Sequence, residues 1–577
     1  MSKVVLTKPT PSLWSKFPYE ITNMIFQNVA PADRPACAVV CREWQVEMEK
    51  QAFKTLDISS DDVVKFYEYV ARNHRRQTYV KDIVYRIQLP DSLAFGTTLP
   101  RQPSRRDRQR VDEENQRRQQ NRLRFIQAIV HVLRILSLWK AEPYYKANTG
   151  NGLALELAID YNRGPDPAEL YGITAFHEMS LREHIHDYQT CREHLPEVPV
   201  VGTFRILRSF FSCLEEPTRA EIMLAFPRLT QVRFEQWYRD AESTYAMPVP
   251  FCAQLMTWPR SVRKMSIYQA LGADFGGPDV DDEPKLEHGD DETDWCILQT
   301  RVGAELAQRS RSMQELSVCN VVEAENFFVA FEPSRYYLAS SPHMANMRFL
   351  TLTTSSISPH ASDRRLNLPN LLRNIALFIP HMPALCVFEL FKARDVEAGR
   401  FQVVVEQEHL QAPRIVVRWA STWRFTIEDN VKMAWINAAM NCDRRRNVHF
   451  EKEELIAESE YFGPAQFIVD YLLTRHNVLH PSTLQDIAED SYDGHGDDDM
   501  MTDPLVKMGF KSPRTESNDD DDEYSKDAKK EVKILKRKMY DAEEEVRRLK
   551  RKIETMQEER GSIFSSSVPS LWSALST

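Results

Sequence analysis

Apolar residues recur along the chain before residue 400 in one arrangement, apolar-x-x-apolar-x-apolar. Alternate residues of a strand point to the same side, so the second and third apolar positions share one face of a short strand. Between these segments lie helix-period stretches, clearest at Leu123–Leu138 and Leu368–Ile379. The triplets are Val80/Ile83/Tyr85, Val201/Phe204/Ile206, Leu229/Val232/Phe234, Val262/Met265/Ile267, Met313/Leu316/Val318, Met347/Leu350/Leu352 and Leu385/Phe388/Leu390, with Leu155/Leu157 as an imperfect member.

A strand followed by a helix, repeated many times, is typical of a leucine-rich-repeat solenoid, in which neighbouring units bury each other's apolar faces. The spacing here is longer and less regular than the roughly 20–29 residues of common repeats. We therefore predict a mixed α/β fold with an irregular leucine-rich-repeat-like solenoid over residues 57–486. Mobile insertions are expected at about 91–120 and 276–294, and a capping part at about 400–480. A non-repetitive α/β domain is the alternative.

A different pattern occupies residues 13–56 and predicts three short helices. Phe17, Ile21, Ile25 and Val29 fall at four-residue spacing on one stripe, with Pro18 at the first helical turn. Cys37, Cys41, Trp44 and Met48 form the stripe of a later helix. A unit this small cannot bury so much apolar surface within itself. Part of this surface must therefore face another protein or another domain of the chain. In the second case the unit would be an amphipathic helical hairpin packed on the domain that follows.

Residues 17–44 resemble an F-box. The resemblance rests on Phe17-Pro18-Tyr19-Glu20-Ile21, Ile25-Phe26 and Val39-Val40-Cys41-Arg42-Glu43-Trp44. Phe17 replaces the usual leucine, and Asp33-Arg34-Pro35 stands where Asp-Leu usually opens the second helix. The resemblance implies that this face docks on the Skp-type adaptor of cullin–RING ubiquitin ligases. The implied adaptor-binding positions are Phe17, Pro18, Ile21, Ile25, Phe26, Val29, Val39, Cys41 and Trp44.

The order of an F-box and then a repeat-like region is similar to that of a large family of filamentous-fungal F-box proteins. The segments Phe226–Trp237 and Met382–Leu390 carry this second resemblance. It implies a substrate-recognition subunit of an SCF-type (cullin–RING) ubiquitin ligase, with the adaptor and a cullin as partners and an unknown protein as substrate. Two alternatives stay open. One is a scaffold that binds partners outside any ligase, and the other is an enzyme with an unrecognised site.

Side chains between the apolar positions of each triplet should point away from the helices, toward a partner. Arg205, Arg233 and Lys264 would lie on three successive rungs, with Tyr268 close to them. Adjacent guanidinium groups suit carboxylates or phosphates through paired hydrogen bonds. We therefore regard these four residues as a possible partner-binding patch for an acidic or phosphorylated segment. Solvated side chains, or side chains paired with Glu235, are the alternative.

The C-terminal part of the sequence has its own character. Residues 487–527 are acidic and poor in apolar side chains, which predicts a disordered linker. Residues 528–560 carry a heptad pattern, which predicts a coiled coil and a possible homodimer, with a single charged helix as the alternative. Its core positions include Val532, Leu535, Met539, Val546, Leu549 and Ile553. Residues 1–12 and 561–577 are expected to be disordered tails.

Composition narrows the function. The net charge of −10 argues against nucleic acid as a partner, because nucleic-acid-binding proteins are normally basic. The chain has only 17 glycines and no glycine-rich nucleotide-binding motif, which argues against the commonest nucleotide-dependent enzymes. Nine scattered cysteines fit free thiols in a reducing compartment, so we expect the cytoplasm or nucleus and no membrane segment. The residues His177, His184, His186, Cys191 and His194 do not meet zinc spacing. No catalytic residue, metal or cofactor is expected.

Overall fold

The computed structural model describes residues 18–89, 105–161, 195–207, 216–236, 255–270, 291–331, 343–358, 368–394, 397–406, 414–442, 447–451, 454–456 and 464–493. Most of the compact unit formed by residues 1–511 lies in these ranges, whereas the second unit, 512–577, lies outside them. The predicted coiled coil at 528–560, both tails and nearly all of the predicted acidic linker therefore lie outside the described residues.

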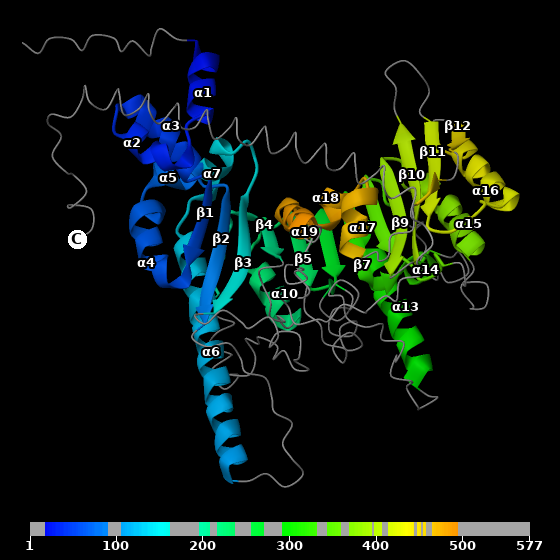
Figure 1. The fold of residues 1–577 in the computed structure, drawn as a ribbon, viewed down its shortest axis with the longest axis horizontal. Coiled ribbons are helices and arrows are strands. Elements are labelled where there is room, and N and C mark those ends of the chain that lie inside the picture. Colours follow the sequence, from blue (N-terminus) through cyan, green and yellow to red (C-terminus); the bar gives the residue numbers. More distant parts are fainter. Residues whose placement is uncertain are drawn as a thin grey trace, which may run out of the picture. The chain divides into compact units, whose positions relative to one another are not determined.

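One 13-stranded mixed sheet organises the first unit (Figure 1). Strands β1 to β9 pair in chain order, each parallel to the next, while β10 is antiparallel to β9 and β11, and β11 is parallel to β12 and β13. The strands are β1 (Thr55–Ser59), β2 (Asp82–Leu89), β3 (Leu153–Tyr161), β4 (Val201–Ile206), β5 (Gln231–Gln236), β6 (Lys264–Gln269), β7 (Glu315–Glu323), β8 (Phe349–Thr353), β9 (Val387–Arg394), β10 (Glu397–Glu406), β11 (Arg414–Ser421), β12 (Asn447–Phe450) and β13 (Glu454–Leu455).

The apolar triplets fall on these strands. Their second and third members lie in β2 and β4 to β9 and are buried, because they project from one face of the sheet into its main core. The register places Phe204, Val232, Met265, Leu316, Leu350 and Phe388 side by side across six strands. A parallel ladder of this kind needs a crossover between successive strands, which explains the alternation seen in the sequence.

Helices supply the crossovers and cover this face. They include α4 (Val63–Phe66), α5 (His74–Tyr79), α6 (Arg105–Ser137), α7 (Ala141–Ala147), α10 (Glu216–Leu224), α13 (Asp291–Ser310), α14 (Ala324–Val329), α15 (Leu368–Phe378) and α16 (Asp429–Met440). The insertion predicted at about 91–120 is partly wrong, since α6 already begins at Arg105 and runs without interruption into its buried end. Its apolar stripe from Phe125 to Leu136 packs into the main core and holds the helix there.

The opposite face of the sheet carries a second, smaller core. Helices α17 (Pro464–Tyr471), α18 (Arg475–Val478) and α19 (Pro481–Asp493) lie across the middle strands (Figure 1). Phe467 stacks on Phe391 of β9 with ring centroids 6.1 Å apart, and Leu479 and Leu484 are buried in the same cluster as Tyr268 of β6. We call residues 464–493 the covering segment. It covers a sheet face, so residues 464–480 of the predicted capping part (about 400–480) do not lie at the end of the strand order, whereas β10 to β12 do.

Candidate functional site

The first candidate site is built by three short helices, α1 (Tyr19–Gln27), α2 (Arg34–Ala38) and α3 (Arg42–Ala52). Phe26 is 4% exposed and packs edge-on against Trp44, with ring centroids 5.1 Å apart. Met48 is buried as well, at 1% exposure. The Phe26–Trp44 contact joins α1 to α3, so this part of the predicted stripe is buried within the unit.

Other apolar side chains of the same helices face outward. Ile21 and Met24, one turn apart on α1, are 39% and 51% exposed, while Val39 and Val40, in the turn between α2 and α3, are 84% and 61% exposed. Single exposed apolar residues are ordinary, but four within one short unit give it apolar side chains that a partner protein can bury. We call Ile21, Met24, Val39 and Val40 the exposed F-box positions.

The structure places the predicted adaptor-binding residues in three groups. Pro18, Ile21 and Val39 are exposed, whereas Ile25, Val29, Cys41 and Trp44 are half-buried and Phe26 is buried. Phe17 lies outside the described residues. Met24 and Val40 were missed as contact candidates, although Met24 lies beside the predicted stripe and Val40 lies inside the quoted motif.

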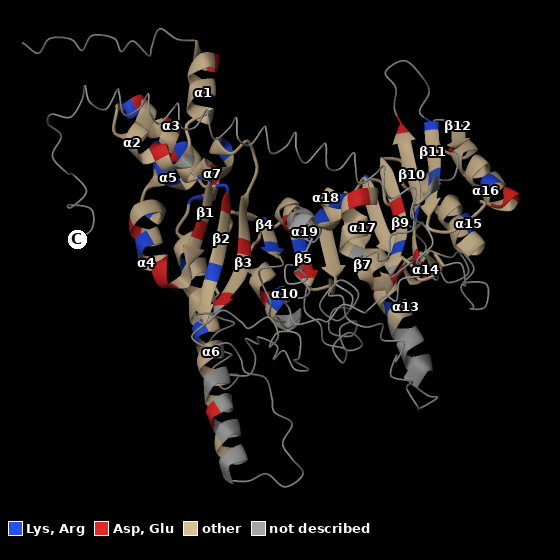
Figure 2. Cartoon of the chain, viewed as in Figure 1, with Lys and Arg blue, Asp and Glu red and all other residues tan. Residues whose placement is uncertain are grey.

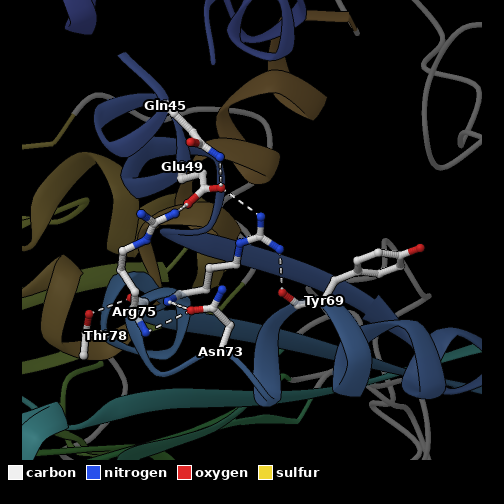
Figure 3. Close-up of polar contacts among 7 residues, drawn as sticks. Gln45, Glu49, Tyr69, Asn73, Arg75 and Thr78 are labelled. Carbon is white, nitrogen blue, oxygen red and sulfur yellow. Dashed lines mark hydrogen bonds and ion pairs between the residues drawn. The ribbon is translucent and has the colours of Figure 1, made fainter. Parts of the chain in front are cut away.

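A charged joint connects the end of α3 to the sheet domain (Figure 3). The Glu49 carboxylate accepts a hydrogen bond from Arg75 Nη2 at 2.6 Å and another from Arg76 Nη2 at 2.8 Å. The Arg76 guanidinium also lies over the ring of Phe53, 5.0 Å from its centroid. Asn73 fixes both arginines, because its side chain accepts hydrogen bonds from their backbone N–H groups at the start of α5.

Two opposing effects set the charge state of this joint. Burial alone raises the pKa of the Glu49 carboxyl, but the hydrogen bonds and positive charges of Arg76 and Arg75 outweigh it and lower the pKa below its usual value. Glu49 is therefore ionised at neutral pH, with its side chain only 8% exposed. Sequence patterns could not reveal this joint, since its partners are 26 and 27 residues apart.

The second candidate site is the sheet face beneath the covering segment. Arg233 of β5 donates a hydrogen bond through Nη2 to the carbonyl of His476 at 2.6 Å, and Ser266 of β6 donates one to the carbonyl of Val478 at 2.7 Å. Glu235 accepts the backbone N–H of His480 at 2.6 Å. These three strand residues therefore contact backbone groups of the covering segment, in addition to the apolar contacts of the second core.

Further along the same face, Glu389 of β9 is fully buried. Its carboxylate accepts hydrogen bonds from the backbone N–H groups of Leu473 at 3.0 Å and Thr474 at 2.8 Å. The Thr474 hydroxyl and the Gln402 amide also donate to it. The start of α18 is thus fixed by one carboxylate surrounded by donors.

The possible partner-binding patch is not an open surface in this structure. Arg233 is 5% exposed and Tyr268 is 0% exposed, because the covering segment lies on both. Arg205 pairs with Asp82 at 3.1 Å, and Lys264 pairs with Glu315 at 2.6 Å. Strand alternation correctly predicts that these side chains point away from the main core. The groups that contact them, however, belong to the same chain and not to a partner.

Other functional possibilities were checked on the described residues alone. No group of three or more His, Cys, Asp or Glu side chains there could hold a metal ion. No helix in that part of the chain has the length and apolar character needed to cross a membrane. The histidine-rich stretch from His177 to His194 lies outside the described residues.

Comparisons with known proteins place two families on this chain. The F-box domain family matches residues 14–49, which are the helices that carry the exposed F-box positions. A family of unknown function (DUF6546) matches residues 257–480, which include strands β6 to β12 and helices α17 and α18. A comparison with curated proteins finds no match. The chain therefore carries an F-box domain at residues 14–49 and a DUF6546 domain at residues 257–480.

Proposed function

We propose that this chain is the substrate-recognition subunit of an SCF-type cullin–RING ubiquitin ligase, acting in the cytoplasm or nucleus. The F-box would bind the Skp-type adaptor, and the adaptor would link the chain to a cullin. The sheet domain, an irregular leucine-rich-repeat-like platform in this proposal, would hold a target protein. The chain's own part is proximity, which raises the effective concentration of the target beside the ligase.

One observation carries the proposal. The F-box helices leave Ile21, Met24, Val39 and Val40 exposed, although Phe26 and Met48 of the same helices are buried. An F-box implies binding of a Skp-type adaptor. The described part of the chain leaves these apolar side chains exposed, so an adaptor can bury them. Burial of each large apolar side chain contributes about 1.5–3 kcal/mol to the free energy of binding.

The charged joint supports the same function in a second way. Glu49, Arg75 and Arg76 tie α3 to α5 by contacts of 2.6 and 2.8 Å. Helix α5 leads directly into β2 of the sheet. A substrate receptor needs its target held at a defined distance from the adaptor, and this joint restrains the F-box relative to the sheet domain.

Affinity purification of the tagged full chain tests the proposal. Recovery of the Skp-type adaptor together with a cullin is the expected result. Recovery of the adaptor without a cullin would instead support the scaffold alternative, in which the chain binds partners outside a ligase. Recovery of neither, from cells that contain both, would contradict the proposal. Pairing of the predicted coiled coil into a homodimer is tested separately, from the mass of the purified chain with and without residues 528–560.

A further inference from the structure

An arginine cluster lies at the amino ends of the middle strands. Arg263 and Arg348 immediately precede β6 and β8, and Gln314 precedes β7 between them. Backbone hydrogen bonds join these three positions side by side, from Gln314 N to Arg263 O and from Arg348 N to Gln314 O, each 2.7 Å long. Neighbouring strands are about 4.8 Å apart, so the two arginine backbones are separated by about 10 Å.

Three more arginines join them from the adjoining loops and from α13, whose basic positions are blue in Figure 2. Arg309, in the last turn of α13, donates a hydrogen bond through Nη2 to the carbonyl of Pro259. Arg263 donates one to the carbonyl of Ser312 at 3.1 Å, which brings it beside Arg311. We call Arg260, Arg263, Arg309, Arg311 and Arg348 the basic edge.

The positive charges of the basic edge are not neutralised by the described residues. None of its five guanidinium groups forms a salt bridge within the described ranges, and the nearby Glu315 is already paired with Lys264 at 2.6 Å. Arg260, Arg263 and Arg348 are exposed. Surface arginines are usually solvated singly, so three exposed arginines beside two that are more buried, with no ion-paired carboxylate among the described residues, form a positive surface.

Arg309 is the buried member of the basic edge. It is only 8% exposed, and its Nε has no hydrogen-bond partner among the described residues. Burial, and then the charges of Arg263 and Arg260, lower the pKa of its guanidinium below the usual value. Leaving a buried charged donor unsatisfied is costly, and a carboxylate at this edge would remove part of that cost.

We propose that the basic edge binds an acidic segment of the target protein, a run of aspartate and glutamate side chains. The inference rests on the proposed function and deepens it, because it names the chemical class of the target. The backbones of Arg263 and Arg348 are about 10 Å apart, and their long side chains can reach carboxylates spaced along one side of an extended peptide. Each guanidinium can hold one carboxylate by paired hydrogen bonds. Nucleic acid is the poorer fit, because the chain's net charge of −10 repels a long polyanion over its whole length, whereas a short acidic segment contacts the basic edge alone.

Fluorescence anisotropy of the full chain with a labelled acidic peptide tests this surface. The probe is a ten-residue peptide in which Asp and Glu alternate, compared with the same peptide carrying Asn and Gln. The expected result is binding of the acidic peptide alone, weakened about tenfold by the double change Arg263→Gln and Arg348→Gln. Arg134→Gln with Arg424→Gln is the matched control, since it removes the same charge from exposed positions elsewhere and should leave binding unchanged.

Three outcomes would overturn the inference. The first is equal binding of the acidic and amide peptides, and the second is equal weakening by the two double variants. The third is tighter binding of a ten-nucleotide single-stranded RNA than of the acidic peptide. Adaptor binding, measured on the same variants, separates this inference from the proposed function. An intact adaptor complex with no peptide binding refutes the basic edge alone, whereas peptide binding without an adaptor complex refutes the ligase role.

Discussion

The Glu49 carboxylate at the end of the F-box lies 2.8 Å from the Arg76 guanidinium of the sheet domain, and this ion pair is largely shielded from water. This contact and the neighbouring one to Arg75 restrain the orientation of the F-box relative to the sheet domain. Their strength depends on both partners, because removing one leaves the other partly buried without its counter-charge.

Glu49→Gln should lower the free energy of unfolding by about 1–3 kcal/mol at pH 7, since it removes the charge that Arg75 and Arg76 share. Because the folded pKa of Glu49 is lowered, its contribution is present above the unfolded pKa and is lost as the pH falls through the folded pKa. The variant and the wild type should therefore converge in acid. Urea unfolding at several pH values measures this difference.

The control for the joint is Glu47→Gln. Glu47 pairs with Lys50 on the surface of the same helix, at 2.5 Å. Exposed pairs of this kind contribute about 0–1 kcal/mol. An equal loss in both variants would show that the joint has no special strength.

Glu323, at the end of β7, gives the opposite pH dependence. Burial, together with the charge of Glu325, raises its pKa from 4.5 to about 7, although the Ser355 N–H donates to it at 2.7 Å. Between these pH values the folded protein keeps a proton that the unfolded chain releases, so stability falls as the pH rises. Glu323→Gln cannot ionise and keeps an acceptor for Ser355. It should be more stable than the wild type by roughly 1–3 kcal/mol at pH 8, with the difference vanishing near pH 4.5.

Thermal unfolding across that pH range checks this prediction. Glu20→Gln removes an exposed carboxyl on α1 and provides the control. A variant that is less stable than the wild type at pH 8 would show that the ionised Glu323 is needed in the folded protein.

Glu389→Gln should loosen the covering segment. The carboxylate is surrounded by donors from Leu473, Thr474 and Gln402, and a glutamine amide would turn an N–H group toward them. We expect a loss of about 1–3 kcal/mol and faster hydrogen exchange within residues 464–493. Glu406→Gln, in a partly exposed pair with Arg414, is the control. Unchanged exchange in the covering segment would mean that its apolar contacts alone hold it.

Much of the fold follows from local patterns. The triplets locate strands because a strand that buries one face has an apolar residue at every second position. In the structure these strands are parallel to their neighbours, with Phe204, Val232 and Met265 in register. The helix stripe from Phe125 to Leu136 likewise predicts the buried end of α6. These features depend on residues close together in the sequence.

The covering segment could not be predicted in the same way. Arg233, Ser266 and Glu235 contact backbone groups of residues 476–480, and a backbone carbonyl or N–H leaves no trace in the sequence. The same limit applies to the basic edge. Arg263 and Arg348 are separated by many residues, and only the sheet register brings them together.

The account depends most on the exposed F-box positions, and the affinity of the purified full chain for a purified Skp-type adaptor tests them directly. Isothermal titration calorimetry should give a one-to-one complex that Ile21→Asp with Val39→Asp weakens at least about 100-fold. Val64→Asp with Leu138→Asp, at positions 64% and 61% exposed outside the F-box, should leave the affinity unchanged. No binding by the wild type, or equal affinity of the F-box variant, would contradict the account.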